Sequence, residues 1–326
     1  MEKVKWGIIG VGDVCEVKSA PAMQLIENSE LVAVMRRTGE LAKDYAQRHN
    51  VPKWYDDADA LINDPDINAI YIATPPDGHL PYALKAAAAG KPVYVEKPMA
   101  RTYQECEEMI AACEQAIVPL FVAYYRRYLP NFLEVKKWLD NGEIGEVRQV
   151  HVSLMQSVRP LVLNNIDKPW RVNPEVAGGG YFYDLASHQL DLLDFLLGPI
   201  ATASGQSANQ GGLYNAEDSV TACWQFENGV LGSGNWCFSA AKSAECDRVQ
   251  ITGSEGMIDF PVFGKGVVTL HKTRSEPLVL EFELPKHIQQ PLITAIVGNL
   301  INGTECDSTG ESAARTNRVM EQIVKQ

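Results

Sequence analysis

Short apolar segments alternate with amphipathic segments through the first 123 residues. The apolar segments predict strands over residues 4–9, 30–35, 53–55, 69–74, 92–95 and 119–123, of which the third is the weakest. The amphipathic segments predict helices over residues 38–50, 79–89 and 102–115, the first and last of them capped by threonines. Strands that alternate with helices form a parallel sheet covered on both faces. We therefore expect a doubly wound α/β domain over residues 1–123.

The pattern changes in residues 124–326, where apolar and polar residues alternate one by one. One helix is predicted over residues 129–139, and strands over residues 147–154, 219–226, 230–236, 248–252, 267–271 and 278–284. Such alternation is typical of a large, open, mostly antiparallel sheet with one buried face, and hence of an α+β domain. Two closing helices, 291–301 and 310–325, are expected to pack back on the first domain. Because the other sheet face needs a cover, we expect a homodimer or homotetramer.

Size, charge and cysteine content indicate the number of domains, the classes of partner that are excluded and the expected cellular compartment. The 326 residues exceed what one hydrophobic core usually supports, which favours two domains. The formal net charge of −12 argues against nucleic acid and anionic membranes as partners, since both need a basic surface. The seven cysteines lack CxxC spacing, so reduced thiols are expected. The amino-terminal sequence enters a strand without an apolar leader, and we expect an unprocessed cytoplasmic protein.

A glycine turn follows the first predicted strand. Gly10 and Gly12 are separated by one residue, and a helix is predicted to begin at Asp13 and Val14. Glycines between a strand and a helix let the backbone approach a pyrophosphate, which the first amide groups of the helix can bind. We therefore expect a Rossmann domain with a dinucleotide cofactor. Cys15 occupies the third small position, where glycine or alanine is usual.

The residues after the second predicted strand indicate which cofactor binds. A carboxylate at this position normally holds the ribose hydroxyls of NAD and repels the 2′-phosphate of NADP. Here the strand is followed by Arg36 and Arg37. A guanidinium group binds a phosphate through two hydrogen bonds and can stack on an adenine. The sequence therefore favours NADP over NAD, while a solvated pair of charges is the alternative.

The fourth predicted strand leads into a proline turn. Thr74 and Pro75 follow this strand at the carboxyl edge of the sheet, where ligands of doubly wound domains bind. The prolines fix an extended turn over the expected cofactor. His79 begins the next helix, and we expect it to cap that helix rather than to act in catalysis.

A lysine follows the fifth predicted strand, at the same carboxyl edge of the sheet. The chain continues as Glu96-Lys97-Pro98, and the proline stops the strand. A lysine at this edge can reach a substrate bound beside a nicotinamide ring. A lysine and proline at an ordinary surface turn are the alternative.

A second group of residues that could take part in binding or catalysis lies between positions 178 and 191. Three glycines precede a predicted helix, and they are expected to let the backbone approach a ligand. Asp184, His188 and Asp191 are spaced to share one helical face, while their neighbours are apolar. This pattern predicts a buried helix whose polar face lines a cleft. A histidine held in the core by the preceding aspartate is the alternative, and no second ligand cluster supports a zinc site.

Pairs of aromatic and arginine residues lie close in sequence to the glycine run and to the expected domain junction. Trp170 and Arg171 precede the glycine run, while Tyr125 and Arg126 lie near the expected domain junction. Aromatic rings beside guanidinium groups suit a nicotinamide or sugar ring and a hydroxyl-rich or anionic ligand. A packing patch between the domains is an equal alternative. Tyr181, directly after the glycines, is a further candidate for substrate binding.

Together these motifs resemble the Gfo/Idh/MocA oxidoreductases over essentially the whole chain. The resemblance implies that Lys97, Asp184 and His188 form the catalytic set, and the absence of a second ligand cluster predicts that no metal takes part. It also implies a set of cofactor contacts: Gly10, Gly12, Asp13, Val14, Arg36, Arg37, Thr74, Pro75, His79, Glu96, Lys97, Trp170 and Arg171. The implied substrate contacts are Tyr125, Arg126, Tyr181, Asp184 and His188. Departures from the family pattern are Cys15 in the glycine turn and Ala186 between Asp184 and His188.

The expected reaction is hydride transfer between the nicotinamide of NADP(H) and a carbinol or carbonyl carbon of a sugar, a sugar derivative or a cyclic polyol. The arginine pair is similar to the NADP-using branch of the family, which contains anhydrofructose reductase and dihydrodiol dehydrogenase. His188, whose ordinary pKa is closest to neutral, is the first candidate for the proton transfer, and Lys97 is the alternative. A dihydrodiol dehydrogenase and a non-catalytic NAD(P)-sensing regulator are the alternative functions.

Overall fold

The computed structural model describes residues 1–164 and 168–324. Within this part of the chain, contacts divide the residues into two compact units. The first unit comprises Met1–Tyr125 and Pro285–Ala314, and the second comprises Arg126–Leu284 and the chain from Arg315. Among the described helices, none combines the length and the apolar character that crossing a bilayer requires.

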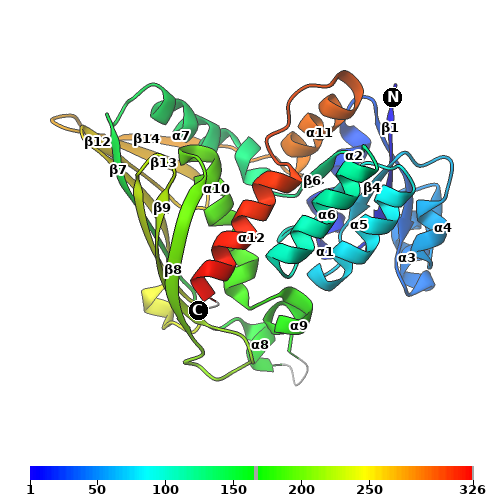
Figure 1. Cartoon of the computed structure of the whole chain (residues 1–326), viewed down its shortest axis with the longest axis horizontal. Coiled ribbons are helices and arrows are strands. Elements are labelled where there is room, and N and C mark those ends of the chain that lie inside the picture. Colours follow the sequence, from blue (N-terminus) through cyan, green and yellow to red (C-terminus); the bar gives the residue numbers. More distant parts are fainter. Residues whose placement is uncertain (165–167, 325–326) are drawn as a thin grey trace. The chain divides into compact units, whose positions relative to one another are not determined.

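The first unit contains a parallel sheet of six strands in the order β3-β2-β1-β4-β5-β6 (Figure 1). The strands are β1 (Val4–Ile9), β2 (Ser29–Met35), β3 (Lys53–Tyr55), β4 (Ala69–Ile72), β5 (Val93–Val95) and β6 (Leu120–Val122). All six were predicted, with ends that differ by at most two residues. This strand order places the topological switch point between β1 and β4, where doubly wound sheets bind ligands at their carboxyl edge.

The long helices of this unit also follow the sequence pattern. They are α3 (Gly39–Arg48), α5 (His79–Ala88), α6 (Tyr103–Gln115) and α11 (Gln290–Asn302). The hydroxyl of Thr102 accepts a hydrogen bond of 3.1 Å from the Glu105 amide, which confirms the predicted cap. Thr38 precedes α3, but no side-chain cap bond is present there. The short helix α1 (Asp13–Val17) begins where a helix was expected after the glycine turn, whereas α2 (Ala20–Leu25), α4 (Ala58–Ile62) and η1 (Pro76–Gly78) were not predicted.

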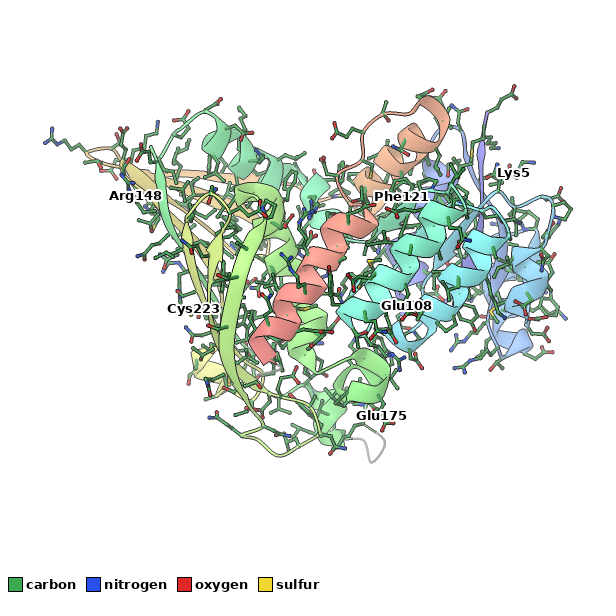
Figure 2. The ribbon with its side chains drawn as sticks, viewed as in Figure 1. Lys5, Glu108, Phe121, Arg148, Glu175 and Cys223 are labelled. Atoms are coloured by element: carbon green, nitrogen blue, oxygen red, sulfur yellow. The ribbon has the colours of Figure 1, made fainter. Side chains whose placement is uncertain are left out.

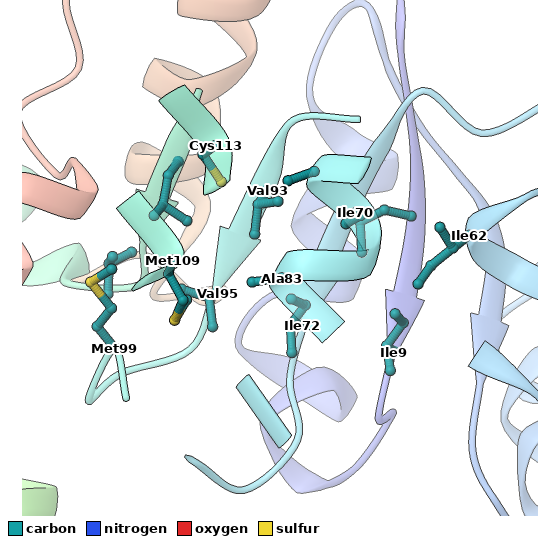
Figure 3. Close-up of a cluster of buried hydrophobic side chains, with 14 of the residues drawn as sticks. Ile9, Ile62, Ile70, Ile72, Ala83, Val93, Val95, Met99, Met109 and Cys113 are labelled. Carbon is teal, nitrogen blue, oxygen red and sulfur yellow. The ribbon is translucent and has the colours of Figure 1, made fainter. Parts of the chain in front are cut away.

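The two faces of the first sheet carry different buried side chains, because successive residues of a strand point to opposite faces. Ile70, Ile72, Val93 and Val95 join an apolar cluster with α4, α5 and α6 (Figure 3). Successive side chains of a strand point to opposite faces. The residues between them, including Tyr71 and Tyr94, therefore lie on the other face, where their rings stack at 4.6 Å. On these central strands one face thus carries aliphatic side chains, while the other carries the hydroxyl groups of Tyr71 and Tyr94.

Residues 308–309 pair with β6, the edge strand of this sheet. An antiparallel bridge joins Phe121 of β6, labelled in Figure 2, to Thr309. The Ser308 hydroxyl donates a hydrogen bond of 2.7 Å to the carbonyl of Val122. Edge strands expose unpaired backbone groups that favour association, so this segment covers part of a vulnerable edge.

The second unit contains a sheet of eight strands in the order β14-β13-β12-β11-β7-β10-β9-β8 (Figure 1). The strands are β7 (Val147–Met155), β8 (Ile200–Ala208), β9 (Ser219–Phe226), β10 (Leu231–Cys237), β11 (Cys246–Gly253), β12 (Gly256–Phe260), β13 (Gly266–Lys272) and β14 (Leu278–Phe282). All neighbours pair antiparallel except β7 and β10, which are parallel. The predicted large, mostly antiparallel sheet is confirmed, although β8 and β12 were not predicted.

Helices of the second unit cover one face of this sheet. They include α7 (Pro130–Asp140), α10 (Ser187–Leu197) and the part of α12 (Gly310–Val324) that belongs to this unit. Along β9, Val220, Ala222 and Trp224 are buried, while Thr221 and Cys223 between them are exposed. Smaller elements are η2 (Tyr125–Tyr128), α8 (Pro160–Asn164), η3 (Trp170–Val172), α9 (Pro174–Ala177) and η5 (Lys242–Ala244). The predicted end of the last helix, Lys325, lies outside the described residues.

Candidate active site

The glycine turn lies between β1 and α1, as expected. Gly10 has a φ of +92°, which side chains rarely adopt, and a Cβ there would lie 2.7 Å from Cγ2 of Thr74. A Cβ on Gly12 would approach only the carbonyl of Gly10, at 3.9 Å. Cys15 is fully buried, and burial raises the pKa of its thiol to about 12, so it serves as a small core residue. The turn is therefore open on its Gly12 side and tightly packed on its Gly10 side.

Arg36 and Arg37 leave the carboxyl end of β2 beside this turn. Both side chains are exposed, and Nη1 of Arg36 lies 3.5 Å from the carbonyl oxygen of Val11. The residues around the turn thus offer guanidinium groups and no carboxylate directly after β2. Such groups can bind a phosphate of a dinucleotide through paired hydrogen bonds.

His79 connects two loops that follow neighbouring strands. Its Nε2 lies 2.8 Å from the carbonyl oxygen of Thr74, and its Nδ1 lies 3.2 and 3.1 Å from the carbonyl oxygens of Pro98 and Met99. The ring is fully buried, and burial lowers its pKa. The structure thus places His79 beneath the expected cofactor surface rather than on it. It fixes the Thr74-Pro75 turn to the loop that contains Lys97.

Glu96 is the centre of a buried hydrogen-bond network. Its Oε1 accepts hydrogen bonds from the Tyr71 hydroxyl at 2.6 Å and from Nε2 of Gln289 at 2.7 Å. Its Oε2 accepts a bond of 3.1 Å from the backbone amide of Lys97. The Tyr94 hydroxyl donates to Oε1 of Gln289 at 2.7 Å. These bonds hold the backbone of Lys97 at the carboxyl end of β5. Gln289 had no sequence signal, because it precedes α11, far along the chain.

Backbone conformation and close contacts within the protein explain why residues 178–180 are glycines. Gly178 ends α9 with a φ of +83°. A Cβ on Gly179 would lie 2.1 Å from the ring of Tyr183, and one on Gly180 would lie 2.8 Å from the carbonyl of Glu217. The glycines therefore let the backbone pack closely against protein atoms, and their approach to a ligand stays a prediction.

The segment that carries Asp184 is not a regular α-helix. A π-helical turn, η4 (Phe182–Ala186), precedes α10. Such turns insert an additional residue and change the angular positions of side chains, and they are frequent at functional sites. Oδ2 of Asp184 lies 3.5 Å from Nε of Arg171, whose guanidinium lies 4.3 Å from the ring centre of Trp170. The structure thus groups three predicted residues: Trp170, Arg171 and Asp184.

His188 lies one turn further along, in α10. The residue is 4% exposed, and its ring contacts Phe263 edge to face, with centroids 6.0 Å apart. The guanidinium of Arg126 lies 4.6 Å from the centre of the same Phe263 ring, and its Nε donates to the carbonyl of Val262 at 3.1 Å. Phe263 therefore contacts two predicted residues. The sequence did not indicate it, since it is a lone aromatic residue in the loop between β12 and β13.

Asp191 does not line a cleft with His188, which corrects the expectation of one shared polar face. It is 1% exposed, and its two oxygens accept hydrogen bonds of 2.9 and 2.7 Å from Nε and Nη2 of Arg127. Arg315 from α12 pairs with Asp194 at 2.8 and 2.7 Å, and Arg127 also approaches Asp194 at 3.4 Å. Burial raises the pKa of Asp191 to about 6, against the lowering effect of Arg127. This cluster of four charges holds α10 in place.

Tyr181, a predicted substrate contact, is almost fully buried. It is 2% exposed and packs against Tyr214 and Phe238. The guanidinium of Arg159, a residue that the sequence did not single out, lies 4.3 Å from its ring centre. In the described part of the chain, histidine, cysteine, aspartate and glutamate side chains do not gather in groups of three or more that could hold a metal ion.

The fold and the glycine turn define an enzyme class, the oxidoreductases with a dinucleotide-binding domain. Comparison of the sequence with family models agrees. Residues 4–124 match the model described as oxidoreductase family, NAD-binding Rossmann fold. Residues 132–259 match the model of the GFO/IDH/MocA C-terminal domain. The chain therefore belongs to the Gfo/Idh/MocA oxidoreductase family.

Individual relatives extend this result over nearly the whole chain. Oxidoreductase P35 of Formosa agariphila is 38% identical, covering 98% of each chain. The 1,5-anhydro-D-fructose reductase of Ensifer adhaerens is 28% identical, covering 94% of this chain and 91% of its own length. The crystal structure of aldose-aldose oxidoreductase from Caulobacter crescentus, complexed with glycerol, superposes with a TM-score of 0.84 at 26% identity. That alignment covers 98% of this chain and 96% of the other chain.

Proposed function

We propose that this enzyme transfers a hydride between NADP(H) and a carbinol or carbonyl carbon of a sugar, a sugar derivative or a cyclic polyol. The observation that carries the proposal is the position of Lys97. The Glu96 network holds its backbone at the same sheet edge as the Gly10–Gly12 turn. The names of the relatives, an anhydrofructose reductase and an aldose-aldose oxidoreductase, support a sugar-like substrate. Screening NADPH consumption against ketoses, dicarbonyl sugars and cyclic polyols tests the proposal.

We assign the chemical roles as follows. The bound cofactor supplies or accepts the hydride. His188 moves the proton at the substrate oxygen, because a histidine titrates closest to neutral pH. Lys97 donates a hydrogen bond to the same oxygen and stabilises its developing negative charge. Asp184 orients the catalytic groups while its carboxylate is paired with Arg171. The alternative assignment gives the proton transfer to Lys97, whose side chain would then act as the general acid or base.

We expect NADPH to bind more tightly than NADH. Hydrogen bonds to charged groups contribute about 1.5–3 kcal/mol each. Changing Arg36 or Arg37 to Ala should therefore weaken NADPH binding about tenfold or more, while NADH binding changes little. Calorimetric titration of both cofactors measures this. Arg148→Ala, which removes an exposed guanidinium paired with Glu146 in the second unit, is the control. Equal affinity of the unmodified enzyme for the two cofactors would contradict the cofactor assignment.

We also propose that the open face of the eight-stranded sheet joins copies of the chain. On β7, β8, β9 and β10 the positions of this face carry no lysine, arginine, aspartate or glutamate. Protein interfaces are depleted in lysine, glutamate and aspartate in the same way. We expect a dimer or tetramer by light scattering at micromolar concentration. Cys223→Arg, on this face, should produce monomers, while Glu175→Arg on α9 should not (both positions are labelled in Figure 2). A monomeric unmodified protein would contradict the proposal.

A further inference from the structure

A pocket of about 460 Å³ opens in the second unit, where β7 ends and β11 begins. This volume lies within the range typical of small-molecule sites. The polar residues that line it are Gln156, Ser157, Arg159, Lys242, Glu245 and Asp247. All of them belong to one compact unit, so the pocket is complete within that unit.

The acidic groups of this pocket already have donors. Glu245 accepts hydrogen bonds from the amide and the hydroxyl of Ser157, and it pairs with Nζ of Lys242 at 2.7 Å. Asp247 accepts bonds of 3.1 and 2.6 Å from the amides of Val262 and Phe263. The lysine charge is therefore balanced within the pocket, and both carboxylates are held by hydrogen bonds.

Arg159 is different, because no carboxylate lies within ion-pair distance of it among the described residues. Its Nη2 donates to Oε1 of Gln156 at 3.1 Å, and its guanidinium lies 4.3 Å from the ring centre of Tyr181. A guanidinium carries five N–H donors, so most of them remain for a ligand. The Tyr181 ring is itself packed against Tyr214 and Phe238, which makes it a rigid support.

Tyr181 connects Arg159 in the structure to a residue assigned to the reaction. The Arg159 guanidinium lies 4.3 Å from the Tyr181 ring centre, and Tyr181 directly precedes the π-helical turn that carries Asp184. Oδ2 of Asp184 lies 3.5 Å from Nε of Arg171. Burial raises the pKa of Tyr181, and the charge of Arg159 opposes this effect.

We propose that Arg159, supported by Tyr181, binds the carboxylate of a sugar acid, so that the substrate is a uronic or aldonic acid rather than a neutral sugar. This inference rests on the proposed function and specifies its substrate class. The planar fork of a guanidinium matches a carboxylate through two parallel hydrogen bonds. A phosphate would bring a second negative charge into a pocket that Glu245 and Asp247 also line. A singly charged carboxylate fits these surroundings better.

Direct binding to the full chain tests this inference without a requirement for turnover. Calorimetry would compare D-glucuronate, D-galacturonate, D-mannuronate and D-gluconate with D-glucose, D-galactose, D-mannose and D-glucitol, and with D-glucose 6-phosphate. We expect at least one acid to bind about tenfold or more tightly than its neutral counterpart. Arg159→Gln should remove this difference and leave neutral sugars unchanged, and Arg159→Lys should retain part of it. Lys242→Gln, in the same pocket but already paired, is the matched control and should change affinity less than threefold.

The outcomes separate this inference from the proposed function. It is overturned if no acid binds more tightly than its neutral counterpart, if the phosphate binds most tightly, or if Arg159→Gln weakens acids and neutral sugars equally. NADPH titration and turnover are measured in parallel. An acid preference that depends on Arg159, without NADPH binding or turnover, would support the subsite and contradict the proposed function. If instead neutral sugars are turned over equally well by the unmodified enzyme and by Arg159→Gln, and no acid is preferred, the proposed function is supported and the subsite is contradicted.

Discussion

Replacing Lys97 or His188 by alanine is expected to lower the turnover number about 100-fold or more. Groups that move a proton or stabilise charge in the transition state typically contribute two to four powers of ten. Cofactor affinity should change little, because neither change touches the glycine turn or the arginines after β2. Steady-state kinetics with a substrate from the sugar screen, together with NADPH titration, measures both quantities. Lys85→Ala, which removes an exposed lysine paired with Asp59, is the matched control and should leave turnover unchanged.

Two further measurements refine this prediction. Asp184→Asn should lower turnover less than either alanine change, because the asparagine keeps the size of the side chain but loses the ion pair with Arg171. The pH dependence of turnover should lose its near-neutral transition in His188→Ala if His188 moves the proton. Retention of that transition would assign the proton transfer to Lys97 instead. Turnover within tenfold of the unmodified enzyme in both alanine variants would contradict the catalytic set.

Arg127→Met is expected to lower the free energy of unfolding by about 3–5 kcal/mol, because removing one partner of a buried ion pair leaves an uncompensated charge. Arg127 is 3% exposed and is held by both oxygens of Asp191. Denaturant titration measures the loss. The double variant Arg127→Met with Asp191→Leu should recover much of it, since well-packed apolar residues often replace a buried ion pair without loss. Arg148→Met, at an exposed ion pair, should have little effect.

The destabilisation should also depend on pH. The pKa of Asp191 in the folded enzyme is already raised from 3.8 to about 6 by burial. A carboxyl group with a raised folded-state pKa costs stability as pH rises from its unfolded to its folded pKa. Loss of Arg127 removes the strongest lowering influence, so this cost should continue to grow above pH 6 in Arg127→Met. Unfolding measurements between pH 5 and 8 test this, and Asp191→Asn in the same background should abolish the additional slope. A difference from the unmodified enzyme that is constant with pH would contradict this account.

The sequence contained more information about the first unit than about the second. Except for the edge strand β3, each strand of the first sheet is a short, largely apolar run that is buried on both faces, so composition alone marks it. In the second unit, β9 alternates between buried and exposed residues and was predicted with its observed bounds. The edge strand β8 was missed because Ile200 is its only large apolar residue. Its conformation follows from backbone pairing with β9, which local composition does not indicate.

The sequence by itself determined the kinds of residue available for chemistry: the turn at Gly10 and Gly12, the arginines after β2, Lys97 after β5, and His188. These are local signals, because strand ends and turns depend on neighbouring residues. Only the tertiary structure decided which partner each polar group takes. Asp191 meets Arg127 from 64 positions away, and Glu96 meets Gln289 from 193 positions away. Such pairs form because a buried charge or amide must find a partner where packing brings distant segments together, and periodicity along the chain does not record that choice.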